Sequence, residues 1–102
     1  MEKVLSGKVA IVTGANQGLG LQIAHRYLAA GADLMLCARN AALLDQARSE
    51  LLAGASPGQK ILAQIADVSV ESDVQNVVKQ ALDQLNGCHI LVNNAGVYGP
   101  KG

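Results

Sequence analysis

The chain has 102 residues, enough for one domain or part of one, and half of them are hydrophobic. Eight Lys and Arg residues balance eight Asp and Glu residues, so the net charge gives no basis for binding nucleic acid or an anionic membrane surface. The start of the chain lacks the apolar core of a signal peptide, and no apolar run is long enough to cross a bilayer. We therefore expect a cytoplasmic protein with no nucleic-acid or membrane partner.

Aromatic residues are scarce, with no Trp or Phe and two Tyr, so Val, Ile, Leu and Ala must build the core, as in helix-covered parallel sheets. The two cysteines, Cys37 and Cys88, lie far apart in apolar segments, and neither has a Cys neighbour. We expect buried free thiols rather than a disulfide. His89 follows Cys88, but a zinc site needs three or four convergent ligands, so we predict no metal site.

The first predicted strand, at about Val9 to Thr13, is an apolar run that ends in Gly14-Ala-Asn-Gln-Gly18-Leu-Gly20. In strand–turn–helix nucleotide sites, glycines at this spacing have separate roles. Gly14 makes the tight turn, Gly18 lets the backbone approach a pyrophosphate, and Gly20 lets the helix pack close to the strand. The N–H groups and the positive dipole end of the helix that starts here would bind an anion.

That helix is predicted from about Gly18 to Ala30, and Gly31 is expected to end it. Its apolar stripe consists of Leu19, Ile23, Tyr27 and Leu28. The opposite face carries Gln22, His25 and Arg26, so we expect His25 to be a solvated surface residue rather than a catalyst.

A second strand is predicted from Asp33 to Ala38, and Asn40 is suited to cap a second helix. This helix is expected to direct Leu43, Leu44, Ala47 and Leu51 inward. A turn-rich loop at 54–59 then separates it from a third strand at about Ile61 to Ala66.

The third helix, from about Val70 to Leu85, has the clearest periodicity, with Val74, Val77, Val78, Ala81, Leu82 and Leu85 on one face. Gly87 is expected to break it, and a fourth strand follows at His89 to Val92. Alternating strands and helices argue for a parallel sheet with right-handed crossovers. We predict an α/β fold, an incomplete doubly wound parallel sheet of Rossmann type with strand order 3-2-1-4.

Polar or small residues follow all four predicted strands. They are the glycine turn, Arg39, the pair Asp67-Val68 and the run Asn93-Asn94-Ala95-Gly96. The carboxyl ends of parallel strands form the rim where open α/β sheets bind their ligands. We therefore predict one ligand site that uses all four segments.

In the order and spacing of these motifs, the sequence resembles the short-chain dehydrogenases/reductases over residues 6–98. The motifs are Thr13-Gly14-x-x-x-Gly18-x-Gly20, Asp67-Val68 and Asn93-Asn94-Ala95-Gly96. The resemblance implies that the backbone around Asn16, Gln17, Gly18 and Leu19 lines a cofactor diphosphate. It further implies that Asp67 bonds the adenine amino group and that Val68 covers the ring.

The same resemblance implies that Asn94, Ala95 and Gly96 run beside the cofactor ribose, whereas Asn93 ties neighbouring strands together. For both asparagines, a purely structural role is an equal alternative to a role at the cofactor, because polar side chains at strand ends often satisfy backbone groups. The expected cofactor-binding residues are Gly14, Asn16, Gln17, Gly18, Leu19, Gly20, Arg39, Asn40, Asp67, Val68, Asn94, Ala95 and Gly96.

The end of the second strand indicates which cofactor to expect. Enzymes that use NAD commonly place an acid there, which bonds the ribose hydroxyls and repels a 2′-phosphate. Here Ala38 and Arg39 occupy that place, and neither Asp33 nor Asp45 is positioned to replace the acid. The Arg39 guanidinium would give a 2′-phosphate a charge-assisted partner worth about 1.5–3 kcal/mol.

We therefore expect NADP(H) to be preferred. The alternative is that Arg39 is an ordinary solvated arginine in a loop. NAD(H) stays possible, because Gln17 stands where some NADP users carry a second basic residue.

The resemblance implies hydride transfer assisted by a Ser, a Tyr and a Lys, with the last two sharing one helix face four residues apart. Tyr98 and Lys101 are three apart with Pro100 between them, so we assign no catalytic residue. We expect residues 1–102 to be a single NAD(P)-binding segment, truncated before the catalytic half and inactive alone. We expect its parent to be a homo-oligomeric carbonyl reductase or alcohol dehydrogenase that acts on a small carbonyl or alcohol substrate. The alternative is a non-catalytic NADP-binding regulator.

Overall fold

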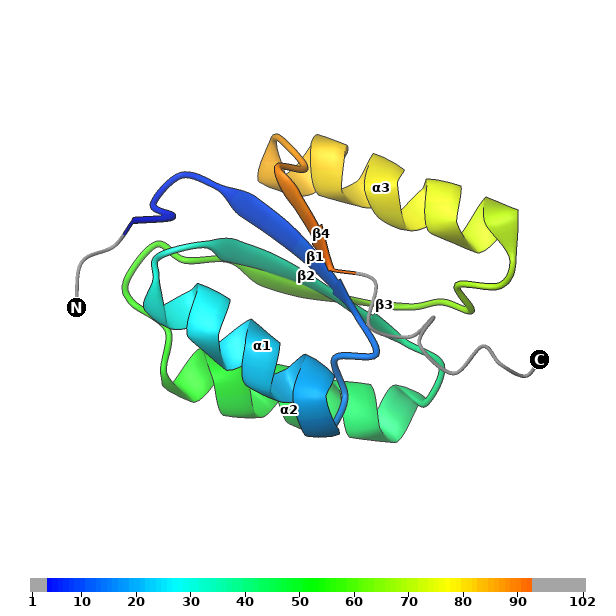
Figure 1. Ribbon diagram of the computed structural model, residues 1–102, viewed down its shortest axis with the longest axis horizontal. Coiled ribbons are helices and arrows are strands. Elements are labelled where there is room, and N and C mark those ends of the chain that lie inside the picture. The colour runs from blue at the N-terminus through cyan, green and yellow to red at the C-terminus, as the bar shows by residue number, and fades with distance from the viewer. Residues whose placement is uncertain (1–3, 93–102) are drawn as a thin grey trace.

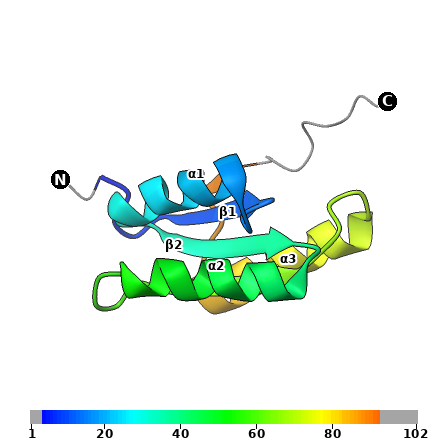
Figure 2. The same cartoon turned by 90° about the horizontal axis from the view of Figure 1, so that it is seen from below.

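The computed structural model describes residues 4–92, which alternate between strand and helix (Figure 1). The elements are β1 (Val9–Thr13), α1 (Gly18–Ala29), β2 (Asp33–Ala38), α2 (Ala41–Ala53), β3 (Ile61–Ile65), α3 (Glu71–Leu85) and β4 (Ile90–Val92). The strands form one parallel sheet in the order β3-β2-β1-β4. In Figure 2 the arrows of β1 and β2 point toward the same end of the molecule. The predicted doubly wound α/β fold is confirmed.

Helices cover both faces of the sheet, with α1 and α2 on one side and α3 on the other (Figure 1). Alternate residues of a strand point to opposite faces, so β1 contributes to two cores. Ala10 and Val12 pack toward α1 and α2, whereas Val9 and Ile11 pack toward α3. This two-sided burial is the reason why β1 and β2 are apolar along almost their whole length.

The buried stripe of α1 differs from the predicted one. Gly20, Ala24 and Leu28 are buried at a spacing of four residues, whereas Leu19 is 63% exposed. The small side chains of Gly20 and Ala24 let the helix lie close to the sheet, which turns Leu19 toward solvent in the first turn. The prediction that Leu19 faces inward was therefore wrong.

The predicted stripe of α3 needs a similar correction. Val77, Ala81 and Leu85 are buried at the same four-residue spacing, but Leu82 is 51% exposed. Its position lies one residue past that row and faces away from the sheet. In α2 the predicted pattern holds, with Leu44, Ala47 and Leu51 buried and Leu43 partly buried.

Three helix ends test the residues that were predicted to cap or break a helix. Gly31, at φ +102°, follows the C-cap of α1 as predicted, and the Asn40 side chain caps α2 by accepting a hydrogen bond from Leu43 N at 2.9 Å. At the end of α3 it is Asn86, at φ +67°, that adopts the left-handed conformation. Asn tolerates this region better than most residues, so Asn86 caps the helix in place of the predicted breaker Gly87, and α3 ends at Leu85 as predicted.

Candidate functional site

The turn between β1 and α1 has the backbone that its glycines predict. Gly14 and Gly18 have φ values of +62° and +59°, which L side chains rarely adopt. A Cβ placed on Gly18 would meet nothing within 4 Å, so its backbone faces open space. Thr13 Oγ1 donates a hydrogen bond to Val92 O at 3.1 Å and joins the carboxyl end of β1 to that of β4.

The start of α1 is built differently from the starts of α2 and α3. Its N-cap Gln17 makes no side-chain capping bond, and its first turn has no acidic residue. By contrast, Asn40 caps α2, and Glu71 and Asp73 lie in the first turn of α3. With no acidic residue in that turn and open space at Gly18, the N-terminal N–H groups of α1 can receive an anion.

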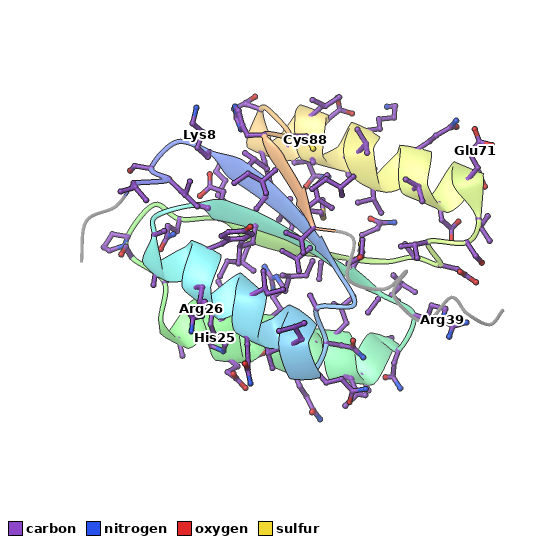
Figure 3. The ribbon with its side chains drawn as sticks, viewed as in Figure 1. Lys8, His25, Arg26, Arg39, Glu71 and Cys88 are labelled. Carbon is purple, nitrogen blue, oxygen red and sulfur yellow. The ribbon has the colours of Figure 1, made fainter. Side chains whose placement is uncertain are left out.

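The next strand ends bring Arg39 and Asp67 together. In the β2–β3 pairing Ala38 lies opposite Ile65, and Ala66 N donates to Ala38 O at 3.0 Å, so the residues that follow are neighbours. Arg39 Nη1 lies 3.9 Å from Asp67 Oδ2, and their side chains are 76% and 36% exposed. Figure 3 shows Arg39 beyond the end of the sheet, at the same end of the molecule as Glu71.

The Asp67 carboxylate is held by its own loop. Its Oδ1 accepts hydrogen bonds from Ser69 N at 2.9 Å and from Ser69 Oγ at 2.6 Å. Bonds to the charged form, first from the Ser69 hydroxyl and then from its backbone N–H, lower the pKa of Asp67. Desolvation opposes them, and the charge of Arg39 contributes the smallest lowering effect. The group is therefore a fixed negative charge.

The structure thus brings three of the four predicted segments to one edge: the glycine turn, Arg39 with Asn40, and Asp67 with Val68. Asn16 and Val68 are half-buried there, Gln17 is exposed, and Gly20 is buried in the first turn of α1. The fourth segment, with Asn94, Ala95 and Gly96, lies outside the described residues, as do Asn93, Tyr98 and Lys101.

The histidine and cysteine side chains away from this edge make contacts of a structural kind. His25 is exposed on α1, as predicted, and pairs with Glu50 of α2; with Arg26 it points away from the sheet (Figure 3). Cys37 is a buried free thiol whose burial raises its pKa to about 11, whereas Cys88 is only half-buried, contrary to expectation. Within residues 4–92, no cluster of three or more His, Cys, Asp or Glu side chains is arranged to hold a metal ion.

The role of His89 was missed at the sequence level. Its Nδ1 accepts a hydrogen bond from Val9 N at 2.9 Å, at the opposite end of β1 from the glycine turn. A histidine next to a cysteine suggests a pair of metal ligands, but here the ring of His89 completes the pairing of β1 and β4. The only signal in the sequence was the predicted strand order, which places β1 beside β4.

Two further features lie apart from this edge. A groove of about 280 Å³ beside β3, lined by Arg48 and Gln84 among others, contains none of the predicted cofactor-binding residues. No helix in the described part of the chain has the length and hydropathy needed to span a membrane.

Comparison with known proteins identifies the family. The model of the short chain dehydrogenase family matches residues 8–102, and the chain therefore belongs to the short-chain dehydrogenases/reductases. The chain is 34% identical over 95 residues to 1-deoxy-11-beta-hydroxypentalenate dehydrogenase of Streptomyces arenae, an alignment that covers 93% of this chain and 33% of that protein.

Solved structures agree in fold. L-sorbose reductase from Gluconobacter frateurii, complexed with NADPH and L-sorbose, is 38% identical with a TM-score of 0.85, over 94% of this chain and 36% of that one. A short chain dehydrogenase/reductase from Burkholderia phymatum in complex with NAD is 30% identical with a TM-score of 0.79, over 86% of this chain and 30% of that one. The chain spans about a third of the length of these relatives.

Proposed function

We propose that the chain is the cofactor-binding segment of an oxidoreductase that prefers NADP(H), with the dinucleotide lying across the carboxyl ends of β1, β2 and β3. The observation that carries the proposal is the start of α1. There Gly18, at φ +59°, presents bare backbone to open space at a helix end with no capping side chain. A diphosphate fits such a place, because helix N–H groups and the dipole favour an anion and a Cβ would obstruct its approach.

The residues after β2 support a preference for a 2′-phosphate. Ala38 ends the strand and Arg39 follows it with an exposed guanidinium, so no carboxylate stands where a ribose-binding acid would. Asp33 lies at the other end of β2, where its Oδ1 accepts a hydrogen bond from Lys60 N at 2.9 Å. Asp45 belongs to α2. An arginine in this place suits a phosphate, since its planar fork donates several hydrogen bonds at once.

Adenine recognition is the proposed role of the segment after β3. Asp67 stays ionised, and its Oδ2 is directed toward Arg39 and solvent while Ser69 holds Oδ1. An adenine amino group can donate to this carboxylate, with Val68 beside the ring. Bound there, the nicotinamide cofactor would supply hydride transfer, while the described residues bind and orient it.

For the whole protein we propose a cytoplasmic, homo-oligomeric enzyme that interconverts a small carbonyl compound and its alcohol. The family and the dehydrogenase and reductase relatives support this class of reaction. The chain itself is proposed to bind the cofactor without turning it over, because its described residues line only the cofactor side of such a site.

The test is a fluorescence titration of the chain with NADPH and with NADH. The proposal expects binding of both, with the lower Kd for NADPH, and a loss of that difference in Arg39→Met. Equal Kd values for the two cofactors in the unmodified chain would contradict the NADP(H) preference. Oxidation of NADPH by the chain in the presence of a carbonyl compound would contradict the assignment of a binding role alone.

A further inference from the structure

The pair formed by Arg39 and Asp67 joins the residue proposed to attract a 2′-phosphate to a carboxylate of opposite charge. We propose that Asp67 is a specificity-determining residue that limits the preference for NADP(H). It pairs with Arg39 when no cofactor is bound, and it repels the additional phosphate when NADP(H) binds. This inference rests on the proposed function, because it concerns the choice between two cofactors at the same site.

Asp67 cannot easily turn away from Arg39. Its Oδ1 is held by two hydrogen bonds from Ser69, its backbone N donates to Asp73 Oδ2 at 2.9 Å, and its O accepts from Val70 N at 2.9 Å. These four bonds fix the carboxylate to the loop between β3 and α3, with Oδ2 left on the side of Arg39.

Arg39 is the more exposed partner of the pair. Its side chain is 76% exposed, and the 3.9 Å separation from Asp67 Oδ2 is long for a hydrogen-bonded ion pair. A contact of this kind between exposed groups is weak, because solvent screens it and the long side chain loses freedom. The guanidinium can therefore turn its other N–H donors to a stronger anion at a modest cost in free energy while it stays beside Asp67.

The charges then determine the direction of the effect. An anion bound by Arg39 comes close to Asp67, since one guanidinium nitrogen is already within 4 Å of that carboxylate. Two negative charges in one site oppose each other, which weakens binding of the 2′-phosphate. NADH carries a hydroxyl in place of that phosphate, so its binding escapes this repulsion. Any contact of Asp67 with adenine is common to both cofactors and cancels in the ratio of their Kd values.

The experiment measures the ratio Kd(NADH)/Kd(NADPH) at low ionic strength for the unmodified chain and for Asp67→Asn. Asn keeps the volume and the oxygen that accepts from Ser69 while it removes the charge. We expect the ratio to rise about two- to five-fold, the size typical of an exposed charge pair, and the rise to shrink with added salt. In an Arg39→Met background the same change should raise the ratio less. Asp67→Ser, a second neutral variant, should act in the same direction.

The matched control is Asp83→Asn, which removes the same charge from α3, where Asp83 pairs with Lys79 instead of Arg39. This variant should leave the ratio unchanged. A ratio that stays constant or falls in both Asp67 variants, while the unmodified chain still prefers NADPH, would overturn the inference and leave the proposed function standing. If the unmodified chain shows no preference for NADPH, both the NADP(H) assignment and this inference are overturned.

Discussion

His89 and Val9 form two reciprocal hydrogen bonds, in one of which the His89 side chain takes the place of a backbone acceptor. Val9 N donates to His89 Nδ1 at 2.9 Å, and His89 N donates to Val9 O, also at 2.9 Å. The ring nitrogen thus serves as the acceptor for a backbone donor at the start of β1, just before β4 begins. The pair fixes the start of β4, and the hydrogen bond from Thr13 Oγ1 to Val92 O joins the other end of this strand to β1.

We predict that His89→Ala lowers the free energy of unfolding by about 1 kcal/mol, because the Val9 N–H loses its acceptor. His89→Asn is the control, since its side-chain oxygen can accept the same bond and should recover much of the loss. Urea denaturation of the three proteins measures the difference. Equal stabilities of His89→Ala and the unmodified chain would show that water replaces the ring without loss.

A second prediction concerns Gly87, which lies against the same ring. A Cβ on Gly87 would stand 2.8 Å from His89 Cε1, too close for both to stay in place. Gly87→Ala should therefore destabilise the chain by displacing His89, and it should do so much less in a His89→Ala background. A double-mutant cycle in urea measures this coupling. Additive effects would contradict it.

Asp67 gives a prediction about pH. Because its pKa is lowered in the folded chain, its contribution to stability is present above the pKa of the unfolded chain and is lost as the pH falls through the folded value. Ser69→Ala should move the pKa of Asp67 back toward that of an ordinary aspartate, and by more than Arg39→Met does, since the Ser69 hydroxyl is the largest cause. Carboxyl NMR titration of the three proteins checks the order. A larger change in Arg39→Met would contradict the assignment.

The two thiols should differ in reactivity. Burial raises the pKa of Cys37 to about 11, so at pH 8 it should react with a thiol reagent far more slowly than the half-buried Cys88. Cys37→Ala and Cys88→Ala assign the two phases, and urea should abolish the difference. The raised pKa also means that Cys37 contributes stability that is lost as the pH rises above about 9. A fast phase that survives in Cys88→Ala in the folded state would contradict the burial.

Much of the fold could be predicted because the hydrophobic period and the turn residues determine where strands and helices begin and end. The alternation of strands and helices, the capping role of Asn40 and the end of α1 just before Gly31 all follow from local chemistry. The exposure of Leu19 and Leu82 could not be predicted in this way. Periodicity defines a stripe, but how closely each helix approaches the sheet decides which edge of the stripe is covered.

The candidate site shows the same division. The strand order 3-2-1-4 places the ends of β2 and β3 side by side, so the neighbourhood of Arg39 and Asp67 follows from topology. Their ion pair does not, because it depends on the turn in which Ser69 holds the carboxylate. The acceptor role of His89 was likewise hidden, since nothing in the sequence says that a ring nitrogen replaces a backbone acceptor.

The most direct test of a dinucleotide at the glycine turn compares two glycines with similar backbones. Gly18 and Gly58 have φ values of +59° and +89°, and a Cβ on either would meet nothing within 4 Å. Gly18→Ala and Gly58→Ala should therefore each cost about 1–2 kcal/mol of stability through backbone strain. In an NADPH titration we predict that Gly18→Ala raises the Kd at least ten-fold, which is about 1.4 kcal/mol, while Gly58→Ala leaves the Kd unchanged. This difference is expected if only the open space at Gly18 receives a diphosphate. Equal Kd values for the two variants would contradict the account, because the cofactor would then lie away from the start of α1.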